Sequence, residues 1–223
     1  MLIKKYLLVS VFILIGLTSV KAQVAASEDA NYTKTITARA DKIVAGLGIT
    51  DSAKYKRVQN VIINQYRSLS TIHDTRNAQV KDIKAQPSED KTADNAKVKA
   101  IDDDVDAKLT KLHGEYLSKL GAEIDAAQIE KVKDAMTYNK VEVTYKGYLA
   151  EIPTLTEPQK AQIKAWLIEA REKAIDAGSS DDKTAIFGKY KGRINNYLSA
   201  QGYDLKKEQE EWQKRIKAGS TGN

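Results

Sequence analysis

The 223-residue sequence has no cysteine, only three prolines and only two histidines, His73 and His113. Without cysteine, neither a disulfide nor a lipid on a processed cysteine can form, so packing alone must stabilise the fold. The scarcity of proline permits long, uninterrupted helices. Because the two histidines fall on different predicted helices, a metal centre would need Asp or Glu to complete it. We therefore predict no metal site and no cofactor.

Catalytic signatures are also missing. The sequence contains neither a nucleophile elbow nor a Ser, His and Asp constellation, and the spatial separation of paired carboxylates cannot be derived from a sequence. The acidic run around Asp102 to Asp106 lacks the glycine and the twelfth-position Glu of a calcium loop. The sequence does not identify an enzyme and favours a binding role.

No apolar run is long enough to span a membrane. The longest, Tyr6 to Leu17, follows Lys4 and Lys5 and precedes Val20-Lys21-Ala22. This order is typical of a secretory signal peptide, and the run is shorter than the roughly 20 residues of a spanning helix. We predict a signal peptide over residues 1–22 and a single domain over residues 23–223, located in the periplasm or outside the cell.

The net charge depends on that cleavage. The full chain has 36 Lys and Arg against 30 Asp and Glu, and three of the lysines lie in residues 1–22, which leaves 33 against 30. The nearly balanced remainder gives no support to nucleic-acid binding.

Apolar residues recur every three or four positions along most of the chain, which indicates an all-α fold. Two long helices, from about Asp51 into the early eighties and from Val98 to Leu120, flank a polar turn at Gln86 to Asp94 and predict an antiparallel hairpin. Helices over about 157–177 and 180–200 predict a second hairpin. Between them, Val141, Val143 and Tyr145 alternate, which predicts a short, tyrosine-rich extended crossover over 137–153.

Part of the chain matches another part. Tyr116 to Ile124 and Tyr197 to Leu205 share the pattern Y-L-S-x-x-G-x-[ED]-[IL], in which the glycine would take a left-handed conformation after a helix. We interpret residues 49–136 and 155–217 as two related halves of one helical bundle.

The densest group of aromatic, amide and cationic side chains lies between Gly188 and Leu205. A saccharide site needs a flat ring to cover a sugar face and amides or cations to bond its hydroxyls or a uronate. The alternative is that the tyrosines belong to the core and that Gly188 and Gly192 allow another helix to approach. The candidate ligand-binding residues are Lys189, Tyr190, Lys191, Arg193, Asn195, Asn196 and Tyr203, with Trp166 as a neighbour.

Several phrases resemble a secreted Bacteroidota family that is known only as a domain of unknown function. They are V-K-D-A-M-T-Y from Val132, T-Y-K-G-Y from Thr144, L-T-E-P-Q-K-A-Q-I from Leu155, and A-G-S-S-D-D-K with F-G-K-Y-K-G-R-I-N-N-Y-L-S-A-Q-G-Y-D-L between Ala177 and Leu205. The resemblance implies sugar binding, which has been suggested for that family, and an association with polysaccharide-utilisation loci, especially for pectin. It implies no established active site.

Two functions follow as expectations. The first is a secreted helical accessory protein that binds a carbohydrate, such as a pectic oligosaccharide, or another cell-envelope ligand. The alternative is a periplasmic protein-interaction or chaperone-like module that binds an envelope protein and no small molecule, because long amphipathic hairpins suit such a role.

Overall fold

The computed structural model describes residues 29–86 and 89–220, and the predicted signal peptide lies outside them. The described residues form helices and contain no strand, which confirms the all-α prediction. A first helix covers residues 29–45. The others are α2 (Ser52–Ala85), α3 (Lys91–Gly121), α4 (Ala126–Met136), α5 (Lys140–Glu151), α6 (Glu157–Ala174), α7 (Ser180–Ala200) and α8 (Leu205–Ser220).

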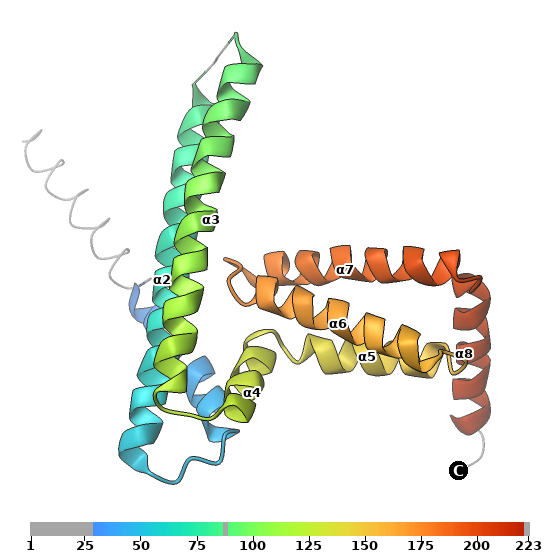
Figure 1. Ribbon diagram of the computed structural model, residues 1–223. Helices are drawn as coiled ribbons and strands as arrows, with labels where there is room; N and C mark the ends of the chain where they lie inside the picture. The colour runs from blue at the N-terminus through green and yellow to red at the C-terminus, as the bar shows by residue number, and fades with distance from the viewer. Residues whose placement is uncertain (1–28, 87–88, 221–223) are drawn as a thin grey trace, which may run out of the picture.

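The two predicted hairpins are present (Figure 1). Helices α2 and α3 run antiparallel as a long upright pair, and α6 and α7 form a shorter pair that lies across it. The Asp51 carboxylate begins α2 by accepting hydrogen bonds from the backbone N–H groups of Ala53 and Lys54. At the start of α4, Asp125 and Gln128 form a capping box, with reciprocal bonds of 2.8 and 3.2 Å.

Two hydrophobic cores hold these elements together. One core joins the first helix, α2, the end of α3 and α4 around residues such as Val44, Ile62 and Leu120. The other joins α5, α6 and α7 around residues such as Ile163, Leu167 and Ile194, with α8 against its edge. Ile175, just after α6, packs in the first core, so the α6–α7 loop is the point where the second hairpin is seated on the first.

The extended crossover predicted for residues 137–153 is wrong, because most of this segment is helix α5. Val141, Tyr148 and Ile152 are buried, and their spacing of seven and four residues belongs to a helix face. Val143, which alternates with Val141 in the sequence, is 66% exposed. The alternating pattern was therefore coincidental, and the core selects the helical period.

The ends of the matched segments differ in structure. Gly202 has a left-handed φ of 92°, as the sequence comparison predicts. Gly121, in contrast, is the last residue of α3 and is not among the positive-φ glycines. Tyr116 is buried at 2% exposure, whereas Tyr197 is only partly buried. The nine-residue match therefore does not extend to the backbone or to the buried face.

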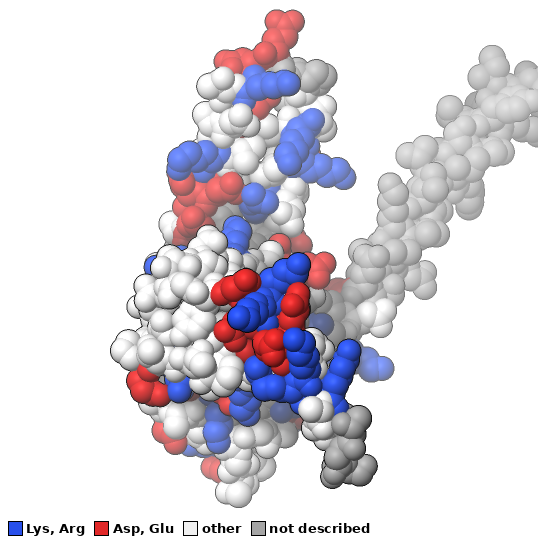
Figure 2. Space-filling view, turned by 90° about the vertical axis from the view of Figure 1, so that its right-hand side faces the viewer, with Lys and Arg blue, Asp and Glu red and all other residues white. Residues whose placement is uncertain are grey.

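Helix α8 lies at the far end of the second hairpin. Figure 2, viewed from that side, shows Lys and Arg interleaved with Asp and Glu along this helix, beside a broad uncharged area. The Lys214–Glu211 pair, at 2.8 Å, is one such neighbouring pair. Of the helices described, none is both long and apolar enough to cross a membrane.

Candidate functional site

Four residues of the α6–α7 surface form one cluster, and three of them were predicted as site residues. The Arg193 guanidinium lies 4.5 Å from the ring centroid of Trp166, and the Tyr190 hydroxyl donates a 2.6 Å hydrogen bond to Glu169. Arg193 also approaches the same carboxylate at 3.4 Å. Glu169 thus links Tyr190 to Arg193, and Arg193 covers the ring of Trp166 that a sugar would stack on.

The other predicted residues lie elsewhere. Asn195 accepts a 2.7 Å hydrogen bond from Tyr148 and lines, with Lys191, a groove between α5, α7 and α8. Tyr203 donates to Gln159 at 2.9 Å, at the start of α6. Lys189 lines a separate cleft between the two hairpins, and Asn196 is exposed on α7. The structure therefore distributes the eight residues over several surfaces, and their role in ligand binding stays a prediction.

A different site is organised by the turn between α4 and α5. Tyr138 and Asn139 have φ values of 59° and 54°, in the left-handed region that residues with a side chain rarely adopt. Tyr138 is also 48% exposed, so its ring projects into solvent instead of packing in a core. Two consecutive left-handed residues without a glycine are a form of strain that is commonly retained at binding sites.

The hydrogen bonds of this turn explain its shape. Asn139 N–H donates to the Asp134 carbonyl at 2.8 Å, and Tyr138 N–H donates to the Ala135 carbonyl at 3.2 Å. These are the two bonds of a Schellman motif, which ends a helix with one left-handed residue, most often glycine. Tyr138 occupies the position that usually belongs to glycine. The hydroxyl of the buried Thr137 donates a 2.9 Å hydrogen bond to the Lys133 carbonyl, and this bond holds the last turn of α4.

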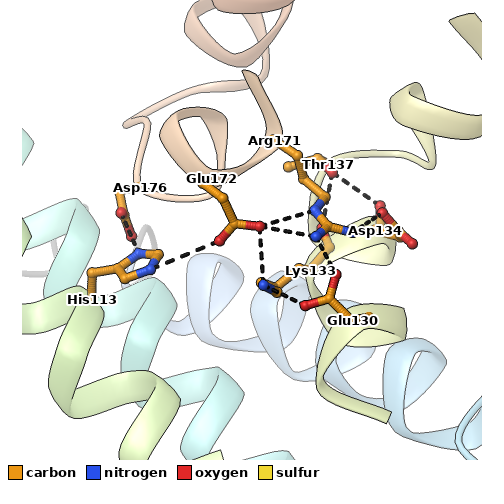
Figure 3. Close-up of polar contacts among 8 residues, drawn as sticks. All are labelled: His113, Glu130, Lys133, Asp134, Thr137, Arg171, Glu172 and Asp176. Atoms are coloured by element: carbon orange, nitrogen blue, oxygen red, sulfur yellow. Dashed lines mark hydrogen bonds and ion pairs between the residues drawn. The ribbon is translucent and has the colours of Figure 1, made fainter. Parts of the chain in front are cut away.

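An ionic cluster fixes α4 before the turn (Figure 3). Arg171 of α6, only 3% exposed, donates to Asp134 at 2.6 Å, to Glu172 at 2.9 Å and to Glu130. Lys133 bonds the same Glu172 at 3.0 Å. Such charge-assisted bonds are stronger than neutral ones and are directional. The cluster therefore holds the end of α4 against α6 and fixes the direction in which Tyr138 leaves the helix.

The tyrosine turn borders a groove of about 530 Å³, which we call the tyrosine groove. Its walls come from the first helix, α2, α4 and the turn. The lining residues are Arg39, Lys42, Ile43, Gly46, Leu47, Tyr66, Lys131, Asp134, Ala135, Tyr138 and Asn139. Its size lies in the range of small-molecule sites, and it combines apolar walls with a few polar groups.

The groove carries positive charge. Within residues 29–86 and 89–220, Arg39, Lys42 and Lys131 form no ion pair, and the one lining carboxylate, Asp134, is engaged by Arg171. Burial raises the pKa of Tyr66 to about 12, so its hydroxyl stays neutral and keeps its proton. The groove thus offers an exposed ring, a neutral phenol and cationic donors.

A larger cleft of about 840 Å³ lies between α2, α3 and the start of α7. Some of its polar groups are engaged with one another, since Arg76 pairs with Asp102 at 2.8 Å and Ser70 bonds Asp74 at 2.8 Å. Lys173 and Lys189 also line this cleft, and neither forms an ion pair within the described residues. We place the candidate site in the tyrosine groove, because it combines unpaired cations with the exposed ring of Tyr138, which has a left-handed backbone.

The sequence contained one signal for this groove. The segment 137–153 is the most tyrosine-rich connection in the chain, and asparagine tolerates the left-handed conformation that position 139 adopts. Arg39, Lys42 and Lys131 carry no motif, and only the packing of α4 on the first helix brings them together.

The fold and the groove define a class: an all-helical protein with a basic groove that contains an exposed tyrosine. The chain belongs to the family described as "Protein of unknown function (DUF3826)", whose model matches residues 33–218. No curated protein matches the chain at a significant level.

Proposed function

We propose that this chain is a secreted, helical accessory protein that binds a saccharide in the tyrosine groove, with pectic oligosaccharides as the first ligands to test. The observation that carries the proposal is Tyr138, which stands at the glycine position of a Schellman motif and exposes its ring beside the groove. A tyrosine there costs conformational strain, so a role for the exposed ring accounts for its presence.

The ring and the cations support a saccharide in complementary ways. An exposed aromatic face covers the apolar C–H face of a pyranose, and the phenol of Tyr66 and the cations of Arg39, Lys42 and Lys131 supply donors for hydroxyls. Lysine and arginine also bind a uronate carboxylate through charge-assisted bonds.

Isothermal titration calorimetry tests the proposal, with the chain lacking residues 1–22 and a panel of pectic and neutral oligosaccharides. Tyr138→Ala should weaken binding at least tenfold, because a lost aromatic contact and its desolvated area together exceed about 1.4 kcal/mol. Tyr190→Phe removes only the hydroxyl that bonds Glu169 outside the groove, and it should bind as the wild type does.

Two results would contradict the proposal. The absence of binding to every glycan would exclude a saccharide ligand. Normal binding by Tyr138→Ala, combined with loss of binding in Arg193→Ala, would move the site to the cluster around Trp166 that the sequence predicts.

A further inference from the structure

Lys183 is a buried cation without a carboxylate partner. Of the charged side chains that are buried in the described residues, Lys133 and Arg171 each contact carboxylates, whereas Lys183 forms no ion pair. Lys183 is 5% exposed, and its Nζ donates one hydrogen bond of 3.0 Å, to the Met136 carbonyl at the end of α4. A buried charge normally has a partner of opposite sign.

The contact with Met136 explains part of this arrangement. A cation near the carbonyl groups at the end of a helix is favourable. An ammonium group nevertheless has three N–H donors, and this bond uses one of them. The ring of Tyr66 lies 5.8 Å from Nζ and offers a weaker, electrostatic contact.

Lys183 is one of the residues that line a small pocket of about 100 Å³. Arg39, Tyr66 and Tyr138 line this pocket and also the tyrosine groove, so the pocket adjoins the groove. Because a water molecule takes about 30 Å³, the pocket can hold a carboxylate or sulfate group but no sugar ring.

The charges around the pocket favour an anion. Burial lowers the pKa of Lys183 to about 8, and the nearby charge of Arg39 contributes in the same direction. The charge of Asp176 acts in the opposite direction, although Asp176 forms no ion pair with Lys183. Arg39 and Lys183 both line the pocket, and the charge of Arg39 disfavours the charged form of Lys183. A bound anion would offset this effect by attraction to both groups.

We propose that this small pocket is an anion subsite, in which Lys183 and Arg39 bind the negatively charged group of an acidic saccharide. The inference rests on the proposed function, because the sugar ring would occupy the groove beside Tyr138 while its charged substituent enters the pocket. The subsite makes the protein specific for saccharides that carry a carboxylate or a sulfate ester.

Calorimetry with three oligosaccharides of equal length tests the subsite: an oligogalacturonide, a neutral galacto-oligosaccharide and a sulfated one. We expect the wild type to bind at least one acidic ligand about tenfold or more tightly than the neutral one, because a hydrogen bond between two charged groups is stronger than one to a neutral hydroxyl. A preference between the two acidic ligands identifies the charged group.

Three variants test which residues produce the preference for acidic over neutral ligands. Lys183→Met keeps the length of the side chain and should reduce acidic binding to the neutral level, and neutral binding should not change. Arg39→Gln alters an exposed residue, leaves the fold intact and should reduce the preference in the same direction. Lys81→Met, at an exposed position of α2 outside the groove, should behave as the wild type does.

Equal binding of acidic and neutral ligands, or an unchanged preference in both Lys183→Met and Arg39→Gln, would overturn the anion subsite and leave saccharide binding intact. If no saccharide binds, the proposed function fails, and NMR titration of the Lys183 side chain tests the subsite alone. Sulfate should then raise the pKa of Lys183 relative to chloride at equal ionic strength in the wild type, and less so in Arg39→Gln. An equal pKa in both salts would overturn it.

Discussion

Gly178 lies so close to the imidazole of His73 that a Cβ atom at position 178 would come within 2.7 Å of His73 Cγ. The ring cannot easily move away, because His73 Nε2 donates a 2.8 Å hydrogen bond to the Asp176 carbonyl. This contact seats the α6–α7 loop on α2. It therefore positions the start of α7, which carries Lys183.

Gly178→Ala should lower the free energy of unfolding by about 1–3 kcal/mol, because the added methyl group overpacks a fixed contact. Urea unfolding measures the change. In a His73→Ala background the same substitution should cost clearly less, and an equal cost in both backgrounds would show that His73 is not the reason.

Gly192→Ala is the matched control on α7. A Cβ at position 192 would meet nothing within 4 Å, so alanine should raise the unfolding free energy by about 0.5–1 kcal/mol. The same holds for Gly188, around which the structure shows the same open space. The sequence-based idea that these two glycines allow another helix to approach is therefore wrong.

Arg171 is expected to be the main electrostatic link between α4 and α6. Arg171→Met should lower the unfolding free energy by about 3 kcal/mol, because the substitution leaves Glu130, Asp134 and Glu172 close together without their shared cation. Thermal and urea unfolding measure this loss. Arg193→Met removes a half-exposed pair with Glu169 and should cost less than about 1 kcal/mol. If the two variants lost the same unfolding free energy, the buried Arg171 would stabilise the protein no more than the half-exposed Arg193 does.

Sequence reasoning predicted the parts of the fold that depend on local periodicity. The recurrence of apolar residues every three or four positions indicated the long helices α2 and α3, and the polar turn at Gln86 to Asp94 indicated that they form a hairpin. It failed at α5, where residues 141–145 satisfy both a strand and a helix period. Only the partners against which Tyr148 and Ile152 pack decide between the two.

The candidate site was less accessible to such reasoning. A helical wheel places Lys191 and Arg193 on faces of α7, but it cannot show that α6 covers one side and α5 and α8 the other. The tyrosine groove joins segments about a hundred residues apart, such as Arg39 and Tyr138. Their meeting depends on tertiary packing, which leaves no local pattern.

The hydrogen bond between His113 Nδ1 and Asp176 Oδ2, 2.7 Å long, should make stability depend on pH. The bond to Asp176 raises the pKa of His113 above its ordinary value of 6.5, although burial acts in the opposite direction. The contribution is therefore fully present below about pH 6.5 and is lost as the pH rises through the higher folded-state value.

Urea unfolding of the wild type and His113→Gln between pH 5.5 and 8.5 checks this sign. The difference between the two proteins should be about 1–2 kcal/mol at the acidic end, since a hydrogen bond to a charged group contributes about 1.5–3 kcal/mol and partial exposure of the pair reduces this, and it should shrink toward the alkaline end. Lys133 and Glu172 face the same imidazole and remain in both proteins. A difference that grows with pH would contradict the assignment.

Substitutions at Tyr138 should have opposite effects on the stability of the fold and on the proposed saccharide binding. A residue with a Cβ in the left-handed conformation costs about 1–2 kcal/mol, and glycine adopts it without that cost. Stability alone would therefore favour glycine at position 138. The saccharide binding that we propose for the ring accounts for tyrosine at this position.

Tyr138→Gly should raise the unfolding free energy by about 0.5–1 kcal/mol, because the relief of strain exceeds the larger entropy that glycine loses on folding. The same variant should lose saccharide binding with the aromatic ring. Asn139→Gly relieves less strain, since asparagine tolerates the left-handed region, and it keeps the ring, so its binding should be normal. Urea unfolding and calorimetry on the same samples measure both effects. If Tyr138→Gly were less stable than the wild type, the ring would be a packing residue, and the strain would need another explanation.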